Sequence, residues 1–163
     1  GQAEVLGEDE LSALERLADQ HPRRAQRVFD RAVDLREALY RIFTRLARSG
    51  EPDVEDLEVL NAALNTALPH LRIERRAEGF DWTWGGPADA LDRPLWPVAR
   101  SAADLLASDE AIAVRECASE TCSWLFVDRS RSRRRRWCDM STCGNRAKAR
   151  RHYERRKQGR AAD

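Results

Sequence analysis

The apolar residues of the first half of the chain recur at steps of three and four, which is the spacing of one face of an α-helix. Within residues 8–20 they are Leu11, Leu14, Leu17 and Ala18. Beyond Pro22 a longer series comprises Val28, Ala32, Leu35, Leu39, Ile42, Phe43 and Leu46. Proline is favoured in a first helical turn and glycine just after a last one, so Pro22 and Gly50 bracket a long helix over residues 22–48.

A third apolar series follows Asp53, a residue type that caps helix N-termini. Its members are Val54, Leu57, Leu60, Leu64 and Leu68. The spacing predicts a helix that turns these side chains inward and ends at Pro69.

The pattern then changes to an alternation of apolar and polar residues over residues 71–75 and 80–84, with Glu78-Gly79 between them. A period of two with a glycine turn predicts a β-hairpin that places Phe80, Trp82 and Trp84 on one face. Glycine and proline at 85–87 end the hairpin, and a further helix is expected through residues 96–106.

The last third of the chain has few apolar side chains and a different pattern. Residues 115–117 and 124–128 read as short strands, and residues 144–158 are strong helix formers. The fold expected for the whole chain is therefore mainly α with a small β-hairpin (α+β). It would consist of a helical domain over residues 1–109 and a small treble-clef-like module over residues 110–163.

Charge divides the chain at the same place. The net charge is +1, but residues 1–110 carry 14 Lys and Arg against 22 Asp and Glu, whereas residues 111–163 carry 15 against 6. The halves thus have net charges of −8 and +9, an asymmetry typical of an anion-binding tail on a body with another task.

Every cysteine of the chain lies in this basic part. Cys117 and Cys122 enclose four residues, fifteen follow, and Cys138 and Cys143 again enclose four. Two evenly spaced pairs can bind one tetrahedral ion, and zinc is its usual occupant. A unit with so little core also needs such a staple. We therefore predict one structural zinc ion on the four thiolates.

Four other interpretations of the cysteines are an iron–sulfur cluster, a redox switch, two disulfides and buried apolar thiols without a ligand. No segment of about 18 apolar residues and no signal-peptide pattern is found, so a cytoplasmic protein without membrane contact is expected. In the cytoplasm thiols stay reduced, which favours a bound metal ion over disulfides as the role of the cysteines. Four thiolates close the zinc coordination shell and leave no position for a catalytic water.

Arginine is dense around these cysteines, and arginine suits bidentate contacts to phosphate and guanine. A solvated charged face is the alternative. Asn145 and Arg146, at the expected start of the last helix, are candidates for contacts to base edges, although Asn145 could instead cap that helix. The candidate nucleic-acid-binding residues are Arg129, Arg131, Arg133, Arg134, Arg135, Arg136, Asn145, Arg146, Lys148, Arg150, Arg151 and Arg155.

The aromatic residues allow two interpretations in each half. Trp124, Phe126 and Trp137 could stack on unpaired bases, but a miniature core is favoured. The tryptophans at 82, 84 and 96 could line a ligand pocket, but core packing is again favoured. The body shows no phosphate-binding glycine loop and no Ser/His/Asp set, so we do not expect an enzyme.

The segment "CDMSTCGNR" at residues 138–146, preceded by "CASETCSWLFVDRSRSRRRRW", resembles the CGNR zinc-finger family of bacterial proteins. Upstream, "LREALYRIF", "LNAAL", "WPVARSAADLL" and "RECA" resemble its N-terminal partner, the ABATE domain. The resemblance implies a stress-related transcriptional regulator with zinc on the four cysteines and the basic region on DNA. Members usually begin with an extended segment containing an Asn-Thr pair, which is not found before Glu8.

The function expected from the sequence is therefore that of a zinc-dependent DNA-binding regulator whose body senses a signal or dimerises. A homodimer and a small-molecule effector are both compatible with it. The alternative is an adaptor that binds protein or RNA, with zinc only as its scaffold. In a third interpretation the acidic body folds against the basic tail and masks it.

Overall fold

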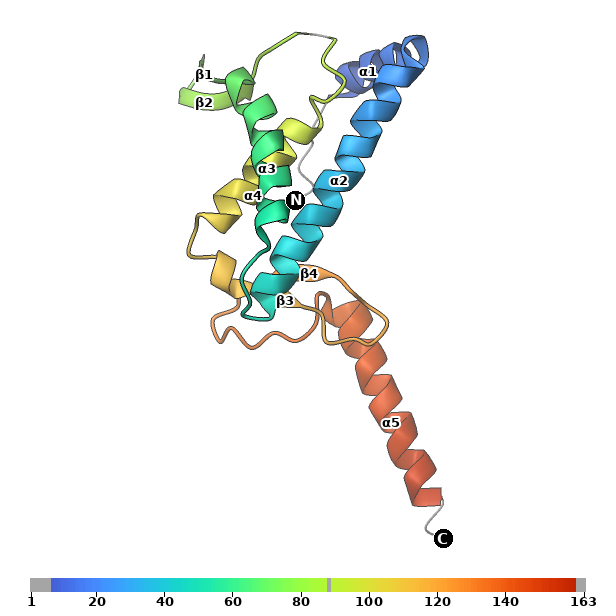
Figure 1. Cartoon of the computed structure of the whole chain (residues 1–163). Helices are drawn as coiled ribbons and strands as arrows, with labels where there is room; N and C mark the ends of the chain where they lie inside the picture. Colours follow the sequence, from blue (N-terminus) through green and yellow to red (C-terminus); the bar gives the residue numbers. More distant parts are fainter. Residues whose placement is uncertain (1–6, 88, 161–163) are drawn as a thin grey trace. The chain divides into compact units, whose positions relative to one another are not determined.

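A computed structural model describes residues 7–87 and 89–160, and its chain divides into two compact units (Figure 1). The first unit comprises Gly1–Ile42 and Asp53–Ala107, and the second comprises Phe43–Pro52 and Ser108–Asp163, as far as these are described. The residues before Gly7, where the family's Asn-Thr segment is not found, lie outside the description. None of the described helices is both long and apolar enough to cross a membrane.

The first two helices follow the predicted pattern. Helix α1 (Glu8–Gln20) has the expected bounds, and α2 (Pro22–Ala47) ends one residue before the expected position. At the start of α1 the backbone N–H of Gly7 donates to the Glu10 carboxylate at 3.2 Å. The buried side of α2 consists of Leu35, Ala38 and Ile42, so three- and four-residue spacing located its inner face correctly.

Helix α3 (Val54–Ala67) begins at Asp53 and passes into a 3₁₀ turn, η1 (Leu68–His70). Three details of the prediction are wrong here. The Asp53 side chain makes no capping hydrogen bond, and Val54 and Leu68 are 66% and 46% exposed because they lie at the ends of the helix. The inward side is Asp56, Leu60 and Ala67.

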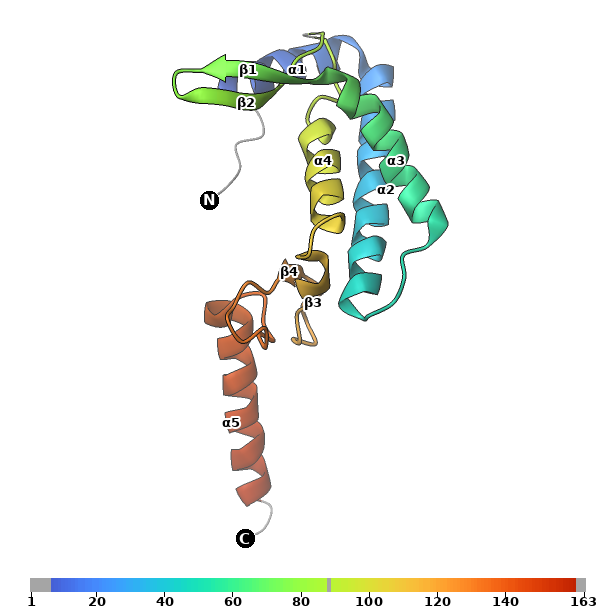
Figure 2. The same ribbon diagram turned by 90° about the vertical axis from the view of Figure 1, so that its left-hand side faces the viewer.

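Strands β1 (Leu71–Arg76) and β2 (Gly79–Trp84) form the expected antiparallel hairpin (Figure 2), with Leu71 opposite Trp84 and Ile73 opposite Trp82. Alternate residues share a face, so Phe80, Trp82 and Trp84 do lie on one side. Only Trp84 packs against the core, since Phe80 and Trp82 are 76% and 53% exposed. The guanidinium of Arg100 lies over the Trp82 ring at 4.5 Å.

Helix α4 (Leu95–Leu106) supplies the largest core side chain, Trp96, which is 2% exposed. The His70 ring stacks on the Trp96 ring with 4.1 Å between their centroids, and the centroid of the Trp84 ring lies 6.0 Å from that of Trp96. Gly86 has a φ of 105°, and a Cβ there would lie 2.8 Å from His70 Nδ1 and 3.0 Å from Trp96. Of the three tryptophans of the body, Trp96 and Trp84 are therefore core residues, whereas Trp82 is on the surface.

The second unit is built around small elements. The 3₁₀ turn η2 (Ala111–Ala113) leads into β3 (Val114–Glu116), which pairs antiparallel with β4 (Leu125–Val127). A π-helical turn, η3 (Met140–Gly144), then runs into α5 (Asn145–Arg160). This order of strand pair and terminal helix agrees with the treble-clef-like arrangement that was expected.

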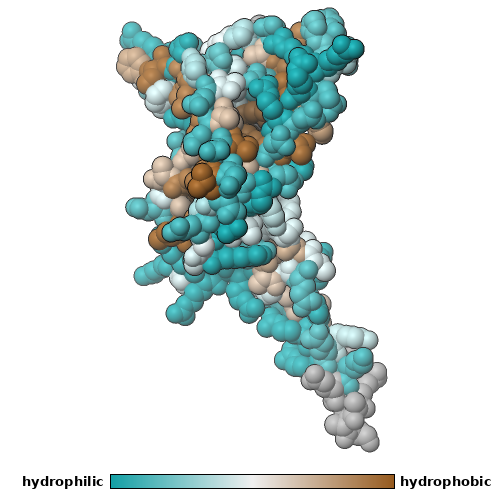
Figure 3. Space-filling model, viewed as in Figure 1, coloured by the Kyte–Doolittle hydropathy of each residue, from teal (hydrophilic) through white to brown (hydrophobic). Residues whose placement is uncertain are grey.

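The second unit buries few apolar side chains, and α5 is almost wholly hydrophilic where it is coloured in Figure 3. Phe126 and Trp137 are half-buried, in agreement with a miniature core. Trp124 is 72% exposed, so its assignment to that core is wrong. The side chain turns outward from the chain between Cys122 and β4.

The last turn of α2 and the loop after it, residues 43–52, belong to the second unit. Arg48 donates to Glu116 of β3 at 2.8 and 3.0 Å. The sequence pattern assigned these residues to the body, because a continuous apolar stripe does not reveal that one helix serves two units.

Candidate metal centre and basic surface

The four cysteines come together from two loops. Cys117 follows β3 directly, and Cys122 lies in the loop before β4. Cys138 ends the long loop after β4, and Cys143 lies in the turn η3 that leads into α5. Their four sulfur atoms all lie within 4.8 Å of one another, although they are far apart in sequence.

These separations fit a single tetrahedral ion. Four sulfurs at 2.3 Å from one zinc would lie about 3.8 Å apart, and the Sγ atom of Cys138 lies 3.7 Å from those of Cys122 and Cys143. A disulfide needs about 2.05 Å, and all four cysteines are free thiols. A polynuclear iron–sulfur cluster would hold its thiolates farther apart, because several metal ions would lie between them.

The thiols differ in how readily they lose their protons. Burial works against ionisation at Cys117, but hydrogen bonds from the backbone N–H groups of Cys138 and Ser119 prevail and lower its pKa to about 7. Burial and the neighbouring sulfurs raise the pKa of Cys138 to about 12, and burial also raises the pKa of Cys143. Cys117 is therefore more readily ionised at neutral pH than Cys138 or Cys143, and a metal ion binds the ionised form.

Asp139 fixes the turn that carries Cys143. One of its carboxylate oxygens accepts hydrogen bonds from the Thr142 backbone N–H at 2.7 Å and from the hydroxyls of Ser141 and Thr142 at 2.5 and 2.6 Å. The Ser141 hydroxyl and the two Thr142 donors lower the pKa of Asp139 to about 2. The carboxylate therefore stays ionised and holds the turn in place.

The two residues after Cys143 close the same turn. Gly144 is buried, and a Cβ there would meet Met140 at 2.4 Å and the Trp137 ring at 3.3 Å. Asn145 donates its side-chain N–H to the Ser141 carbonyl at 3.0 Å. Both residues thus stabilise the junction between η3 and α5 by contacts inside the second unit.

Two arginines of α5 join the helix to the first cysteine loop. Arg146 donates to the Thr121 hydroxyl at 3.0 Å, and Arg150 donates to the Glu120 carboxylate at 2.5 Å and to Glu154 at 3.1 Å. Because Thr121 and Glu120 lie between Cys117 and Cys122, these bonds connect the two metal-binding loops outside the sulfur cluster.

The arginine-rich loop between β4 and Cys138 is organised by one buried carboxylate. Asp128 is fully buried and accepts hydrogen bonds from the backbone N–H groups of Ser130 at 3.0 Å and Arg135 at 2.8 Å. The Ser130 side chain, together with these two N–H groups, outweighs burial and holds the pKa of Asp128 below its usual range. Asp128 thus closes the loop into a ring that returns the chain to Cys138.

Several candidate nucleic-acid-binding residues are engaged within the second unit. Arg129 pairs with Glu110 at 2.7 Å, and Arg135 donates to the carbonyls of Trp137 and Cys138 while lying over Phe126 at 5.0 Å. Arg136 lies over the Trp137 ring at 5.3 Å, and Arg151 donates to the Ala147 carbonyl of its own helix at 3.4 Å.

The other candidates are exposed, and within the described chain their side chains have no hydrogen bond or ion pair. They are Arg131, Arg133 and Arg134 of the loop and Lys148 and Arg155 of α5. The last two are seven residues apart and so lie on the same side of the helix. The twelve residues that the sequence treats alike therefore fall into two groups, which only the three-dimensional contacts distinguish.

Comparison with protein families agrees with this architecture. Residues 6–109 match the ABATE family, described as "Putative stress-induced transcription regulator", and residues 113–156 match the CGNR zinc finger. No curated protein matches the chain. With four clustered thiols at the CGNR segment, this is a zinc-binding protein. Since the first match covers more than half of the sequence, the chain belongs to the ABATE family and carries a CGNR zinc finger.

Proposed function

We propose that this protein is a zinc-dependent DNA-binding regulator of transcription. One structural zinc ion is held by Cys117, Cys122, Cys138 and Cys143. The basic surface of residues 110–163 contacts DNA, and residues 1–109 form the regulatory domain. This role places the protein in the cytoplasm. We assign it no enzymatic activity, because a tetrathiolate shell offers no open coordination position.

The observation that carries the proposal is the group of exposed cations whose side chains make no hydrogen bond or ion pair within the described part of the chain. A charge that already has a partner must lose it before binding phosphate, whereas a free guanidinium loses only water and counterions. Arg131, Arg133 and Arg134 in the loop before Cys138, and Lys148 and Arg155 on α5, meet this condition. Arg136 lies over the Trp137 ring, but within the described chain no acidic group pairs with its charge, so we add it to these five as a sixth cation.

Most contacts of these residues should be made to phosphate, because phosphate contacts dominate protein–DNA affinity. If about six of them meet phosphates, log affinity should fall with log salt at a slope of roughly −5 on duplex DNA.

Asn145 and Arg146 have a different part in this proposal. Each already makes a hydrogen bond within the second unit, to Ser141 and Thr121 respectively. We therefore assign them to positioning α5 against the zinc centre, in place of the base contacts that the sequence suggested. Their loss should weaken binding to all DNA sequences alike, because it destabilises the folded module.

The test is a salt titration of DNA binding with the full zinc-loaded chain, on fragments enriched from genomic DNA. Arg131, Arg133 and Arg134 are replaced together by serine. The matched control replaces Arg16, Arg23 and Arg27, which are exposed in the first unit, so that both variants lose three positive charges. We expect the first variant to flatten the slope to about −2 or −3 and the control to leave it unchanged.

Equal effects of the two triple variants would show that only net charge matters and would contradict the proposed surface. A duplicate titration with RNA competitor separates the nucleic acids. Preferential binding of RNA, or absence of salt-dependent affinity for either, would replace the DNA-binding assignment with the adaptor function.

A further inference from the structure

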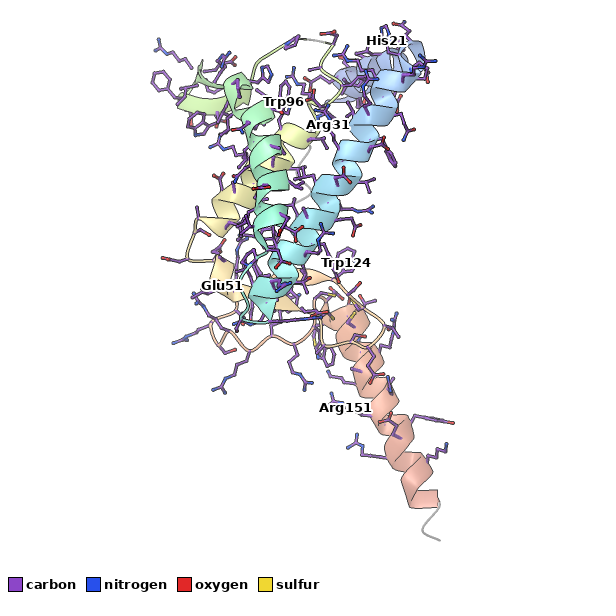
Figure 4. All side chains as sticks on the ribbon, viewed as in Figure 1. His21, Arg31, Glu51, Trp96, Trp124 and Arg151 are labelled. Atoms are coloured by element: carbon purple, nitrogen blue, oxygen red, sulfur yellow. The ribbon has the colours of Figure 1, made fainter. Side chains whose placement is uncertain are left out.

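The first unit contains a cavity of about 520 Å³ between α2, α3 and the start of α4. Its volume is within the range typical of small-molecule sites, roughly 300–1,000 Å³. From Arg31 to Arg41 it follows α2 over ten residues, or about 15 Å of helix. Figure 4 shows Arg31 on α2 and Trp96 on α4, which both line it.

The cavity exists because α3 has small side chains at this surface. Ala62, Ala63 and Thr66 line it from α3, while Leu35 and Leu95 line it from the neighbouring helices. A pair of leucines at the alanine positions would fill much of this space. The apolar part of the wall therefore suits an apolar or aromatic ligand body.

One wall of the cavity contains a donor that the described protein does not satisfy. Trp96 is 2% exposed, and its indole Nε1 is buried without a hydrogen-bond partner. A buried N–H without an acceptor costs free energy. An acceptor atom on a bound molecule would remove that cost once the side chain adjusts to meet it.

The charged side chains that line the cavity are paired with opposite charges, except for one acidic group. Arg41 is held by Asp56 through contacts of 2.6–3.1 Å, Arg31 lies 3.7 Å from Asp92, and Glu37 pairs with Arg36 at 2.6 Å. Asp34, which also lines the cavity, has no hydrogen-bond or ion-pair partner among the described residues. The uncompensated charge is therefore negative.

We propose that this cavity binds a small organic cation with an apolar or aromatic body and a hydrogen-bond acceptor. Its positive group pairs with Asp34, its body lies along the alanines of α3, and its acceptor takes the indole N–H of Trp96. The site lies wholly within the first unit, and its occupation does not depend on the proposed DNA surface.

The probe is berberine, a fluorescent aromatic cation with ether oxygens, titrated into the full zinc-loaded protein without DNA. Its anionic counterpart is 8-anilinonaphthalene-1-sulfonate. We expect saturable binding of berberine with one site per chain and at least tenfold weaker binding of the anion.

Three variants locate the site. Asp34→Asn removes the unpaired charge and should weaken berberine binding about three- to fivefold, the range of a partly exposed ion pair. Asp19→Asn, the same change at an exposed position of α1 outside the cavity, should have no effect. Ala63→Leu fills the cavity and should abolish binding, with circular dichroism showing that the helices remain.

The proposal is overturned if berberine does not bind, if the anion binds as tightly, or if Asp34→Asn and Asp19→Asn are indistinguishable. Should Ala63→Leu fail to fold, the Asp34 and Asp19 pair still decides. DNA binding is read separately, so either proposal can fail while the other holds.

Discussion

The two units of this protein are stabilised in opposite ways. The first buries Leu35, Ile42, Leu60 and Trp96 in a core formed by three helices. Among its described residues, the second buries the apolar side chains of Ala113 and Val114 and two of its cysteines, and its largest fully buried side chain is the carboxylate of Asp128. Folding of the first is driven by apolar burial, whereas for the second we propose stabilisation by a metal ion and a set of local hydrogen bonds.

This difference allows the second unit to be folded and strongly basic at the same time. A surface crowded with arginine cannot also provide an apolar core, because those positions must remain in water. A metal centre removes this conflict, since four thiolates occupy little sequence and leave the intervening residues available for a partner. The predictions below disturb one unit at a time.

Removal of the metal should have the largest effect. Structural zinc contributes on the order of 10–16 kcal/mol in small modules, so a strong chelator should unfold the second unit and leave the first folded. Hydrogen exchange should show loss of protection in residues 43–52 and 108–160 together. Loss in residues 108–160 alone would show that the end of α2 is not part of this unit.

Trp96→Ala should have the next largest effect, confined to the first unit. Deleting a fully buried tryptophan costs about 3–5 kcal/mol, measured by denaturant unfolding. The matched control is Trp124→Ala, because Trp124 is 72% exposed and its loss should change stability by less than about 0.5 kcal/mol. Equal effects of the two changes would contradict the assignment of the core.

Arg146→Ala should destabilise the second unit moderately. It removes the bond to Thr121, and a single hydrogen bond contributes about 0.5–1.5 kcal/mol. The chelator concentration that releases zinc should therefore fall. Lys148→Ala, two residues away and without a recorded partner in the described chain, is the control and should leave zinc release unchanged. If the control behaved like the variant, helix charge would explain the effect in place of positioning.

Arg48→Ala should have the smallest effect. The pair with Glu116 is exposed on the arginine side, and such pairs contribute about 0.2–1 kcal/mol. Hydrogen exchange in residues 43–52 should become faster while the core of α2 around Leu35 is unaffected. Faster exchange along all of α2 would indicate one continuous cooperative helix.

Much of the secondary structure follows from the sequence, because amphipathic spacing and turn residues are local signals. α1, α2 and the hairpin around Gly79 were found in this way. The clustering of the four cysteines was predicted from their spacing, since two pairs with the same four-residue gap are typical of one metal site. What remained hidden depends on long-range contacts: the place of residues 43–52 in the second unit, the exposure of Trp82, and the cavity beside Trp96.

The basic residues illustrate the same limit. Arg134 and Arg150 are the same residue type in the same basic region. Arg150 donates a hydrogen bond to Glu120, thirty residues earlier, whereas Arg134 has no hydrogen bond or ion pair in the described part of the chain. Partners so distant in sequence cannot be inferred from the local pattern. The division between arginines that are bonded within the second unit and arginines that are exposed therefore had to come from the structure.

The most direct test of the account is the metal content and coordination of protein purified without added metal. Elemental analysis and X-ray absorption should show one zinc per chain with four sulfur ligands at about 2.3 Å, and Cys117→Ser should lower the zinc content. Iron in place of zinc, nitrogen or oxygen ligands, or an unchanged metal content in Cys117→Ser would contradict a structural zinc ion held by these four thiolates.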